Sequence, residues 1–222
     1  MRIAIAYRGV FNFQKINQSG VDSSILLDIQ KTLDNHKDML YNIFDDLEID
    51  FYFSTYNLNE EINELYKNNL NLKYYGYIPP SKNPNDRWRV HRDHCKNLIS
   101  KVKSYVELSR ESYDLFVFTR PDIKFLEDFK NLNWDYSKFN ILMEHPSGNC
   151  DDNFFMFPST FLNKFEDSID FLIKDDRITH EINHELVKRL VPIKYHVEYT
   201  WPRGGSSSQK EYLGHTLFKF CK

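Results

Sequence analysis

The stretch "YDLFVFTRPDIKF", Tyr113 to Phe125, decides the fold. Its apolar run from Leu115 to Phe118 is short and rich in aromatic residues, which is typical of a buried strand. The run ends in Thr119-Arg120-Pro121-Asp122, so this strand delivers a cation and a carboxylate at its carboxyl end. Pro121 fixes its own φ and favours an extended Arg120, which predicts that the strand direction holds until the chain turns at Asp122. A β-turn with a solvated aspartate is the alternative.

Strand-like and helix-like segments alternate on both sides of this stretch. Short apolar runs predict strands over 2–7, 49–57, 72–80, 113–118, 139–143, 153–157 and 193–199. Helical spacing predicts helices over 22–47 with a break near Asn35, and over 59–70, 90–108, 159–173 and 180–190. This alternation predicts a single α/β domain, in which helices cover both faces of a mostly parallel central sheet.

The composition excludes several classes of protein. A chain of 222 residues, 41% hydrophobic and 27% charged, suits one globular domain, and a net charge of −3 argues against a nucleic-acid partner. Cys95, Cys150 and Cys221 form no CxxC pair, which disfavours a zinc knuckle and fits a reducing compartment. The start "MRIAIAYRGV" is expected to be a strand and not a signal peptide, and no window is long enough for a transmembrane segment. We therefore expect a cytoplasmic location.

Polar residues follow four of the predicted strands. In a mostly parallel sheet, ligands bind beyond the carboxyl ends of the strands, so these residues are the candidates for chemistry. Carboxylates gathered with arginines suit a phosphorylated substrate, because carboxylates bind a divalent metal and arginine binds phosphate in a bidentate manner. The four ends are Tyr7-Arg8-Gly9, Ser54-Thr55, Arg120-Pro121-Asp122, and Glu144-His145 leading to Asp151-Asp152.

The motif and its surroundings resemble the GT-A-fold (Rossmann-like) glycosyltransferases in which R-x-D replaces the usual D-x-D, including small glycosyltransferase domains of large algal viruses. In that family an aromatic-Asp pair and an apolar run precede the motif, as Tyr113-Asp114 do here. A later stretch of the form D-[DNQ]-x-F is matched by Asp151-Asp152-Asn153-Phe154. His184-Glu185-Leu186 fits the family's next helix more weakly. The resemblance covers about half of the chain, residues 88–199, and a viral relative would place the protein in a host cytoplasm.

The resemblance implies a nucleotide-sugar donor and a glycan or glycoprotein acceptor. Asp122 would coordinate Mn²⁺ or Mg²⁺ bridging the diphosphate. Arg120 stands where the first acid of D-x-D would be, so it would hold a phosphate or orient Asp122, and strict metal dependence stays open. Asp152, ahead of Asp151, is the candidate general base that deprotonates the acceptor hydroxyl in an inverting transfer.

The end of the first predicted strand is the candidate nucleotide pocket. In the similar enzymes Tyr7, Arg8 and Gly9 would hold the base and ribose, and a glycine there lets the backbone approach a ligand closely. Thr55 is a weaker candidate for the same pocket. An ordinary turn after a strand explains Tyr7-Arg8-Gly9 nearly as well.

The segment "DRWRVHRDHCK", Asp86 to Lys96, adds positive charge before the motif. On a helix Arg89, Arg92 and Lys96 share one face, and in similar enzymes this helix faces the donor, so Arg92 is a candidate phosphate ligand. A solvated basic face is the alternative. His91 and His94 lack an HExxH-type partner, which makes a catalytic zinc improbable.

The predicted function is a glycosyltransferase, of the hexosyl- or deoxyhexosyltransferase kind, that uses a UDP- or GDP-sugar. Residues 1–125 would form the nucleotide-binding half, and residues 126–222 the acceptor-binding half with a flexible loop at 202–212. One alternative is a sugar nucleotidyltransferase, which would need a glycine-rich, lysine-bearing phosphate loop near the first strand. Another is a non-catalytic carbohydrate-binding domain, for which the many aromatic residues are suitable.

Overall fold

The computed structural model describes residues 1–9, 23–41, 44, 46–55, 60–78, 87–121, 123–125, 132–144, 148–198, 209–212 and 215–220. Asp122, the predicted metal ligand, lies outside these residues. Among the helices of the described ranges, none is both long and apolar enough to cross a membrane.

A seven-stranded sheet forms the centre of the molecule, in the order β3-β2-β1-β4-β7-β6-β8. Strands β1, β2, β3 and β4 run parallel to one another, and β6 is parallel to β8. Strand β7 is antiparallel to both of its neighbours, β4 and β6. The predicted mostly parallel sheet is therefore confirmed, and β7 is its one reversed strand. The strands are β1 Arg2–Arg8, β2 Glu48–Thr55, β3 Leu72–Tyr77, β4 Leu115–Thr119, β6 Phe139–Glu144, β7 Phe154–Pro158 and β8 Ile193–Glu198.

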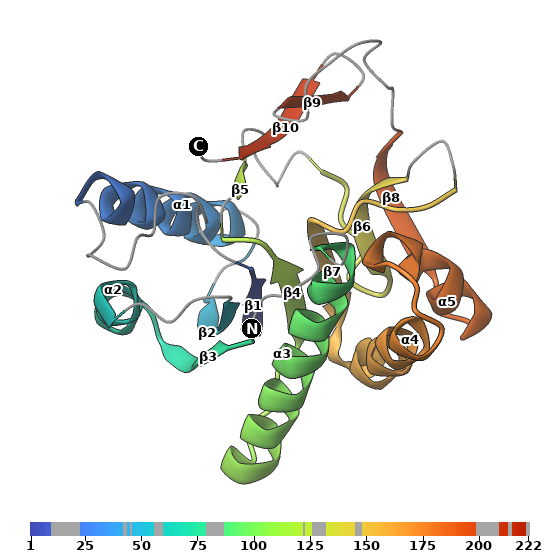
Figure 1. Ribbon diagram of the computed structural model, residues 1–222, viewed down its shortest axis with the longest axis horizontal. Coiled ribbons are helices and arrows are strands. Elements are labelled where there is room, and N and C mark those ends of the chain that lie inside the picture. The colour runs from blue at the N-terminus through green and yellow to red at the C-terminus, as the bar shows by residue number, and fades with distance from the viewer. Residues whose placement is uncertain are drawn as a thin grey trace.

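Helices cover both faces of this sheet (Figure 1). The helices are α1 Ser23–Tyr41, α2 Glu60–Asn69, α3 Arg87–Ser109, α4 Leu162–Lys174 and α5 Ile182–Lys188. Two 3₁₀ turns, Ser159–Phe161 and Thr179–Glu181, precede α4 and α5. Helices α1 and α2 pack on one face, while α3, α4 and α5 pack on the other. Both faces are buried, which explains why the strands read as continuous apolar runs.

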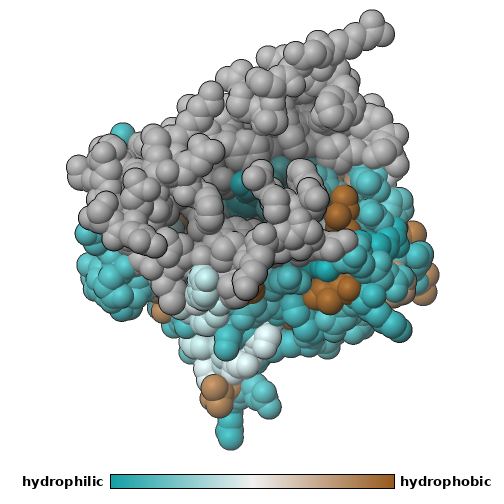
Figure 2. Space-filling model, viewed as in Figure 1, coloured by the Kyte–Doolittle hydropathy of each residue, from teal (hydrophilic) through white to brown (hydrophobic). Residues whose placement is uncertain are grey.

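The alternation along β1 shows how the two faces differ. Ile3, Ile5 and Tyr7 point into the core under α1, whereas Ala4 and Ala6 point toward α3. Small side chains on that side leave room for α3 to lie close to the strand, and the first half of α3 consequently reaches the carboxyl end of the sheet. The described part of the surface in Figure 2 is largely hydrophilic, with hydrophobic residues only in scattered spots.

A second, three-stranded sheet has the order β5-β10-β9 and follows the central motif directly. It consists of β5 Ile123–Phe125, β9 Gln209–Tyr212 and β10 His215–Phe220. The predicted loop over 202–212 is therefore wrong for its last four residues, which form β9. Residues 202–208 of that loop lie outside the described residues. Strands β5 and β9 have only three and four residues, too few to show a periodicity in the sequence.

The predicted helix break near Asn35 is also wrong, because α1 is continuous, and the predicted helix end at residue 47 is wrong because α1 ends at Tyr41. The side chain of Asn35 instead holds β5. Its Oδ1 accepts a hydrogen bond from the backbone N–H of Phe125 at 2.8 Å, and its Nδ2 donates to the carbonyl of the same residue at 3.0 Å. A polar residue inside this helix thus serves a tertiary contact and does not end the helix. The other predicted helices and strands are found within a few residues of their expected limits.

Candidate functional site

The polar strand ends meet at one edge of the sheet, as the sequence predicted. Arg8 at the end of β1 lies opposite Ser54 of β2, and Tyr7 lies opposite Thr119 at the end of β4. Because β7 runs in the reverse direction, it begins at this edge, with Phe154 opposite Thr119. The segment 151–153, which directly precedes β7, is thereby brought next to the ends of β1 and β4.

A buried ion pair between Arg8 and Asp152 joins these segments. The Nη1 of Arg8 lies 3.3 Å from the Oδ2 of Asp152, and the two residues are only 1% and 4% exposed. Among the residues that the structure describes, the Nε and Nη2 of Arg8 find no hydrogen-bond acceptor although both are buried. An unsatisfied buried polar group costs about 1–3 kcal/mol. Such groups in a folded protein call for a missing water, ion or ligand.

Positive and imidazole groups surround Asp152 on several sides. The Nε2 of His180 lies 3.4 Å from its Oδ1, and the Nδ1 of His91 lies 3.7 Å from its Oδ2. Burial alone would raise the pKa of Asp152, but Arg8, together with His180, His91 and Arg120, holds this pKa well below its usual range. Asp152 is therefore ionised throughout the physiological pH range.

His91 on α3 is the site residue that the sequence did not single out. Its Nδ1 accepts a hydrogen bond from the Nη1 of Arg8 at 2.5 Å. Burial and the neighbouring Arg8 lower the pKa of His91 to about 3, so the ring is neutral at physiological pH. The sequence did place His91 next to Arg92, the predicted phosphate ligand. It could not show which of these two side chains points toward the sheet edge.

Arg92 has a different role from the predicted one. Its Nη1 donates to the carbonyls of Leu172 at 3.1 Å and Arg177 at 2.7 Å, and its Nη2 lies 3.1 Å from the Oδ1 of Asp176. These acceptors belong to the carboxyl end of α4 and the turn that follows it, where carbonyls lack partners within the helix. The Arg92 guanidinium therefore ties α3 to α4, and its neighbour His91 faces the site.

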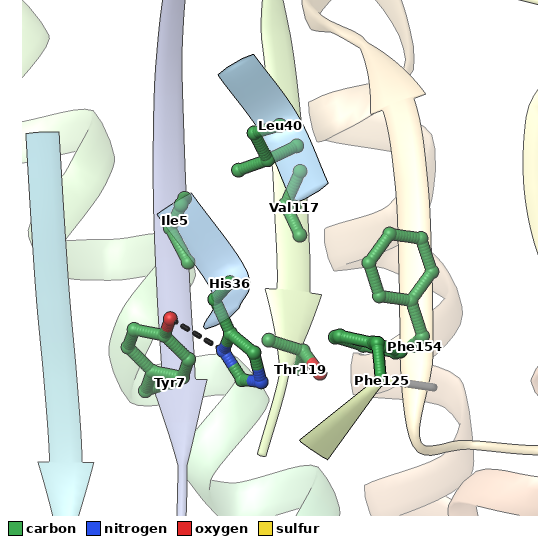
Figure 3. Close-up of a pocket in the computed structure, with 8 residues that line it drawn as sticks. All are labelled: Ile5, Tyr7, His36, Leu40, Val117, Thr119, Phe125 and Phe154. Carbon is green, nitrogen blue, oxygen red and sulfur yellow. Dashed lines mark hydrogen bonds between the residues drawn. The ribbon is translucent and has the colours of Figure 1, made fainter. Parts of the chain in front are cut away.

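The side chain of Tyr7 lies on the opposite face of the sheet from Arg8. Its ring is fully buried, its hydroxyl lies 2.7 Å from the Nδ1 of His36, and its centroid lies 4.7 Å from that of Phe53. Figure 3 shows Tyr7, His36, Thr119 and Phe154 around a small apolar cavity in the core under α1. A ring in this position packs the core and does not offer a surface to a nucleotide base. Only the backbone of Tyr7 belongs to the sheet edge.

Gly9 and Thr55 shape the backbone at the same edge. Gly9 has a φ of +95°, a conformation that favours glycine, and its N–H donates to the carbonyl of Ser54 at 2.9 Å. The carbonyl of Thr55 accepts from the N–H of Ile78 at 2.9 Å, which fixes the end of β3 beside β2. Their contact with a nucleotide stays a prediction.

A buried polar chain supports the end of β2. The Oγ of Ser54 lies 2.7 Å from the Nδ1 of His94 and accepts from the Nδ2 of Asn97 at 3.0 Å. Burial and Arg8 lower the pKa of His94 to about 3. His94 and Asn97 thus anchor α3 to the sheet and fix the helix on which His91 is carried.

The backbone around the motif is held from both sides. Before the motif, the Oγ1 of Thr119 donates to the carbonyl of Asn153 at 2.9 Å. After it, the Nε2 of His36 lies 2.5 Å from the carbonyl of Ile123. Arg120 is partly exposed between these two contacts, and Pro121 is buried. The structure therefore fixes the residues that flank Asp122.

The structure also shows the surroundings of Asp151 and whether the described residues could bind a metal ion. The Oδ1 of Asp151 accepts from the Nδ2 of Asn153 at 2.6 Å, so this carboxylate takes part in the turn before β7. Across the described ranges, no three histidine, cysteine or acidic side chains are arranged to hold a metal ion. The carboxylate of Asp152 is already neutralised by Arg8. The described residues alone therefore do not make up a divalent-cation site.

Comparison with known proteins places the fold. No family model matches the sequence, and no curated protein matches it either. Among solved structures, a nucleoside-diphosphate-sugar pyrophosphorylase from Vibrio cholerae is 9% identical with a TM-score of 0.50, over 88% of this chain and 92% of that one.

Two glycosyltransferases are also similar in structure. One, involved in the glycosylation of the major capsid of PBCV-1, is 10% identical with a TM-score of 0.46, over 87% of this chain and 81% of that one. The other, an active-site mutant of LgtC, is 11% identical with a TM-score of 0.43, over 88% of this chain and 72% of that one. The chain has the GT-A-type α/β fold of nucleotide-sugar enzymes, and the predicted fold class is confirmed.

Proposed function

We propose that the protein is a glycosyltransferase that moves a sugar from a UDP- or GDP-sugar to a hydroxyl of a glycan or glycoprotein acceptor. The observation that carries this proposal is Arg8, a buried cation at the carboxyl edge of the sheet with two donor groups that find no acceptor in the part of the chain that the structure describes. A diphosphate supplies anionic oxygens in the geometry that a guanidinium binds best. In the transfer, Arg8 and Arg120 would stabilise the charge that develops on the leaving nucleotide diphosphate.

Asp152 is assigned two roles, which an experiment separates. A general base works best with a pKa near the operating pH, whereas Arg8 holds the pKa of Asp152 low. We therefore propose that Asp152 primarily fixes the position and charge of Arg8, and that it also serves as the base of an inverting transfer. In Asp152→Asn, loss of a base lowers kcat at unchanged donor affinity, whereas loss of the anchor weakens donor binding.

The use of Mn²⁺ or Mg²⁺ through Asp122 stays a prediction, because that residue lies outside the described part of the chain. Titration of Mn²⁺ into the wild type and into Asp122→Ala tests it directly. Metal-enhanced donor binding that persists in Asp122→Ala removes this residue from the role. We also expect the anomeric configuration of the product to be inverted, which NMR of the product determines.

Two other functions make different predictions. A sugar nucleotidyltransferase has the same fold in the Vibrio cholerae pyrophosphorylase, but after β1 this chain offers only Arg8-Gly9 where such an enzyme needs a glycine-rich loop with lysine. A nucleotidyltransferase would form a nucleoside triphosphate and a sugar 1-phosphate from pyrophosphate and a nucleoside-diphosphate sugar. A non-catalytic carbohydrate-binding domain would bind glycans without any affinity for nucleotides.

A thermal-shift panel of UDP, GDP, CMP and their sugars, with and without Mn²⁺, tests the proposal. The expected result is a higher melting temperature with one nucleoside diphosphate and its sugars, because a ligand that binds only the folded state stabilises it. A panel in which no nucleotide shifts the melting temperature overturns the proposal. Pyrophosphate-dependent formation of a nucleoside triphosphate would replace it by the nucleotidyltransferase.

A further inference from the structure

We propose that His91 is a second ligand-binding residue of this site, which donates a hydrogen bond from its Nε2–H to an anionic oxygen of a diphosphate bound beside Arg8. The inference rests on the proposed function for the identity of the ligand. It adds a residue that neither the motif nor the likeness to other structures assigns.

The tautomer of His91 follows from its contact with Arg8. A guanidinium carries only N–H donors and has no acceptor. The Nη1 of Arg8 lies 2.5 Å from the Nδ1 of His91, so this ring nitrogen must present its lone pair. A neutral imidazole has one proton, which is therefore on Nε2. Arg8 thus converts His91 into a donor of fixed direction.

The charges around the ring agree with a neutral imidazole. Arg8 on β1 and Arg120 after β4 both oppose a positive ring, as does His94 on the same helix. Asp152, before β7, is the group that would favour protonation, but its Oδ2 lies 3.7 Å from Nδ1, farther away than the Nη1 of Arg8. Protonation of Nδ1 would also place its N–H directly against the N–H of Arg8. The donor at Nε2 is therefore preserved over a wide pH range.

His91 is more accessible to a ligand than Arg8 is. The side chain of His91 is 17% exposed, whereas that of Arg8 is completely covered. An oxygen that accepts from the Nε2 of His91 would lie beside the Arg8 guanidinium, which contacts the same ring and whose Nε and Nη2 lack acceptors among the described residues. A neutral donor binds an anionic oxygen without adding a third charge to a site that already contains Arg8 and Arg120. A diphosphate, with several such oxygens, is the ligand class that this arrangement fits.

A matched pair of substitutions separates ligand binding from mere support of Arg8. In His91→Asn the short amide places its oxygen near the former Nδ1 and can still accept from Arg8. In His91→Gln the longer amide places its nitrogen near the former Nε2 and keeps a donor there. We expect His91→Asn to weaken binding of inorganic pyrophosphate, measured by calorimetry, by roughly tenfold or more, the effect of one hydrogen bond to a charged group. His91→Gln should retain most of the affinity. The opposite order would show that His91 only supports Arg8, and the inference would fall.

The tautomer is measured independently in the unliganded protein. Nitrogen-15 NMR of the histidine-labelled protein should show His91 with an unprotonated Nδ1 and a protonated Nε2, and Arg8→Met should remove this preference. A wild-type His91 with its proton on Nδ1 overturns the inference even if a nucleotide binds.

The outcomes distinguish this inference from the proposed function. Pyrophosphate binding that depends on His91, without binding of any nucleotide, supports the inference and sinks the glycosyltransferase. Nucleotide binding that is equal in the wild type and His91→Asn is consistent with the glycosyltransferase and contradicts the inference about His91. A protein that binds neither pyrophosphate nor nucleotide contradicts both.

Discussion

Strand β1 carries an arginine–aspartate pair at each end, partly buried at the first residue and fully buried at the last, and the two pairs differ in how many of their polar atoms have partners. At its first residue, Arg2 donates to Asp50 from Nη2 at 2.6 Å and from Nε at 3.1 Å. Asp50 also accepts from the hydroxyl of Tyr113 at 2.6 Å and from the Nδ2 of Asn71 at 2.5 Å. At its last residue, Arg8 meets Asp152 with one nitrogen at 3.3 Å and leaves two others without an acceptor in the described structure.

The difference indicates what each pair is for. A buried polar network in which every member is satisfied makes the fold rigid, and the pair at the amino end of β1 fits that description. A pair with open donors at the carboxyl edge of a parallel sheet is instead prepared for a ligand. The first pair should therefore matter most for stability, and the second for binding.

Removing the satisfied pair should have the largest effect. Asp50→Ala leaves the hydroxyl of Tyr113 without its acceptor and removes the more deeply buried of the two carboxylates that contact Arg2, so the loss should approach the roughly 3–5 kcal/mol of a broken buried ion pair. Urea denaturation followed by circular dichroism measures the free energy of unfolding. A loss below about 1 kcal/mol would mean that this pair behaves like a surface contact and that the contrast between the two ends is wrong.

Removing the open pair should act on binding in addition to lowering stability, because Arg8→Met leaves the buried carboxylate of Asp152 without its cation. Arg8→Met should lower the affinity for UDP or pyrophosphate roughly tenfold to a hundredfold, because hydrogen bonds to charged groups contribute about 1.5–3 kcal/mol each. The matched control is Arg2→Met, which should lower stability and leave the affinity of the folded protein unchanged. Equal affinities in both variants, measured by calorimetry well below their melting temperatures, would break the comparison.

Low pH should lower the stability of the protein, because His91 at the carboxyl end of the sheet is largely buried as a neutral ring. The pKa of His91 is lowered to about 3 in the folded protein, against about 6.5 in an unfolded chain. Between these values the unfolded chain binds more protons, so stability falls as the pH falls below 6.5. The slope for one such histidine is at most about 1.4 kcal/mol per pH unit. We expect His91→Gln to flatten the decline measured by urea denaturation between pH 6.5 and 4.5, and unchanged slopes would contradict the buried neutral ring.

The smallest effect is expected at the outer partner of Arg2. Glu111 lies 2.6 Å from the Nη2 of Arg2, but its side chain is 44% exposed. Exposed ion pairs contribute little to stability, so Glu111→Gln should leave the free energy of unfolding nearly unchanged. The same urea denaturation used for Asp50→Ala provides the measurement. A loss as large as that of Asp50→Ala would show that the network at this end is not centred on Asp50.

The sequence predicted the sheet and its polar edge because both depend on local patterns. Buried strands read as apolar runs, and the parallel arrangement brings their carboxyl ends together. It did not predict the pair of Arg8 and Asp152 as a contact, because these residues are joined only by the reversal of β7, which no local pattern encodes. The exchange of roles between His91 and Arg92 has a similar cause. Neighbouring residues on a helix point about 100° apart, so the rotation of α3 against the sheet and α4 decides which of them meets the site.

The pairing of β10 with β5 also has a consequence for the order in which the protein is completed during synthesis. Arg8 is synthesised long before its carboxylate partner Asp152, and the strand that follows Asp122 pairs with residues 218–220. Chains fold from the amino end as they are made, at about 5–20 residues per second. The sheet under α1 can therefore assemble early, while β5 can pair with β10 only after residue 220 has been added. A nascent chain stalled before β10 would have a nearly complete central sheet and an unfinished site.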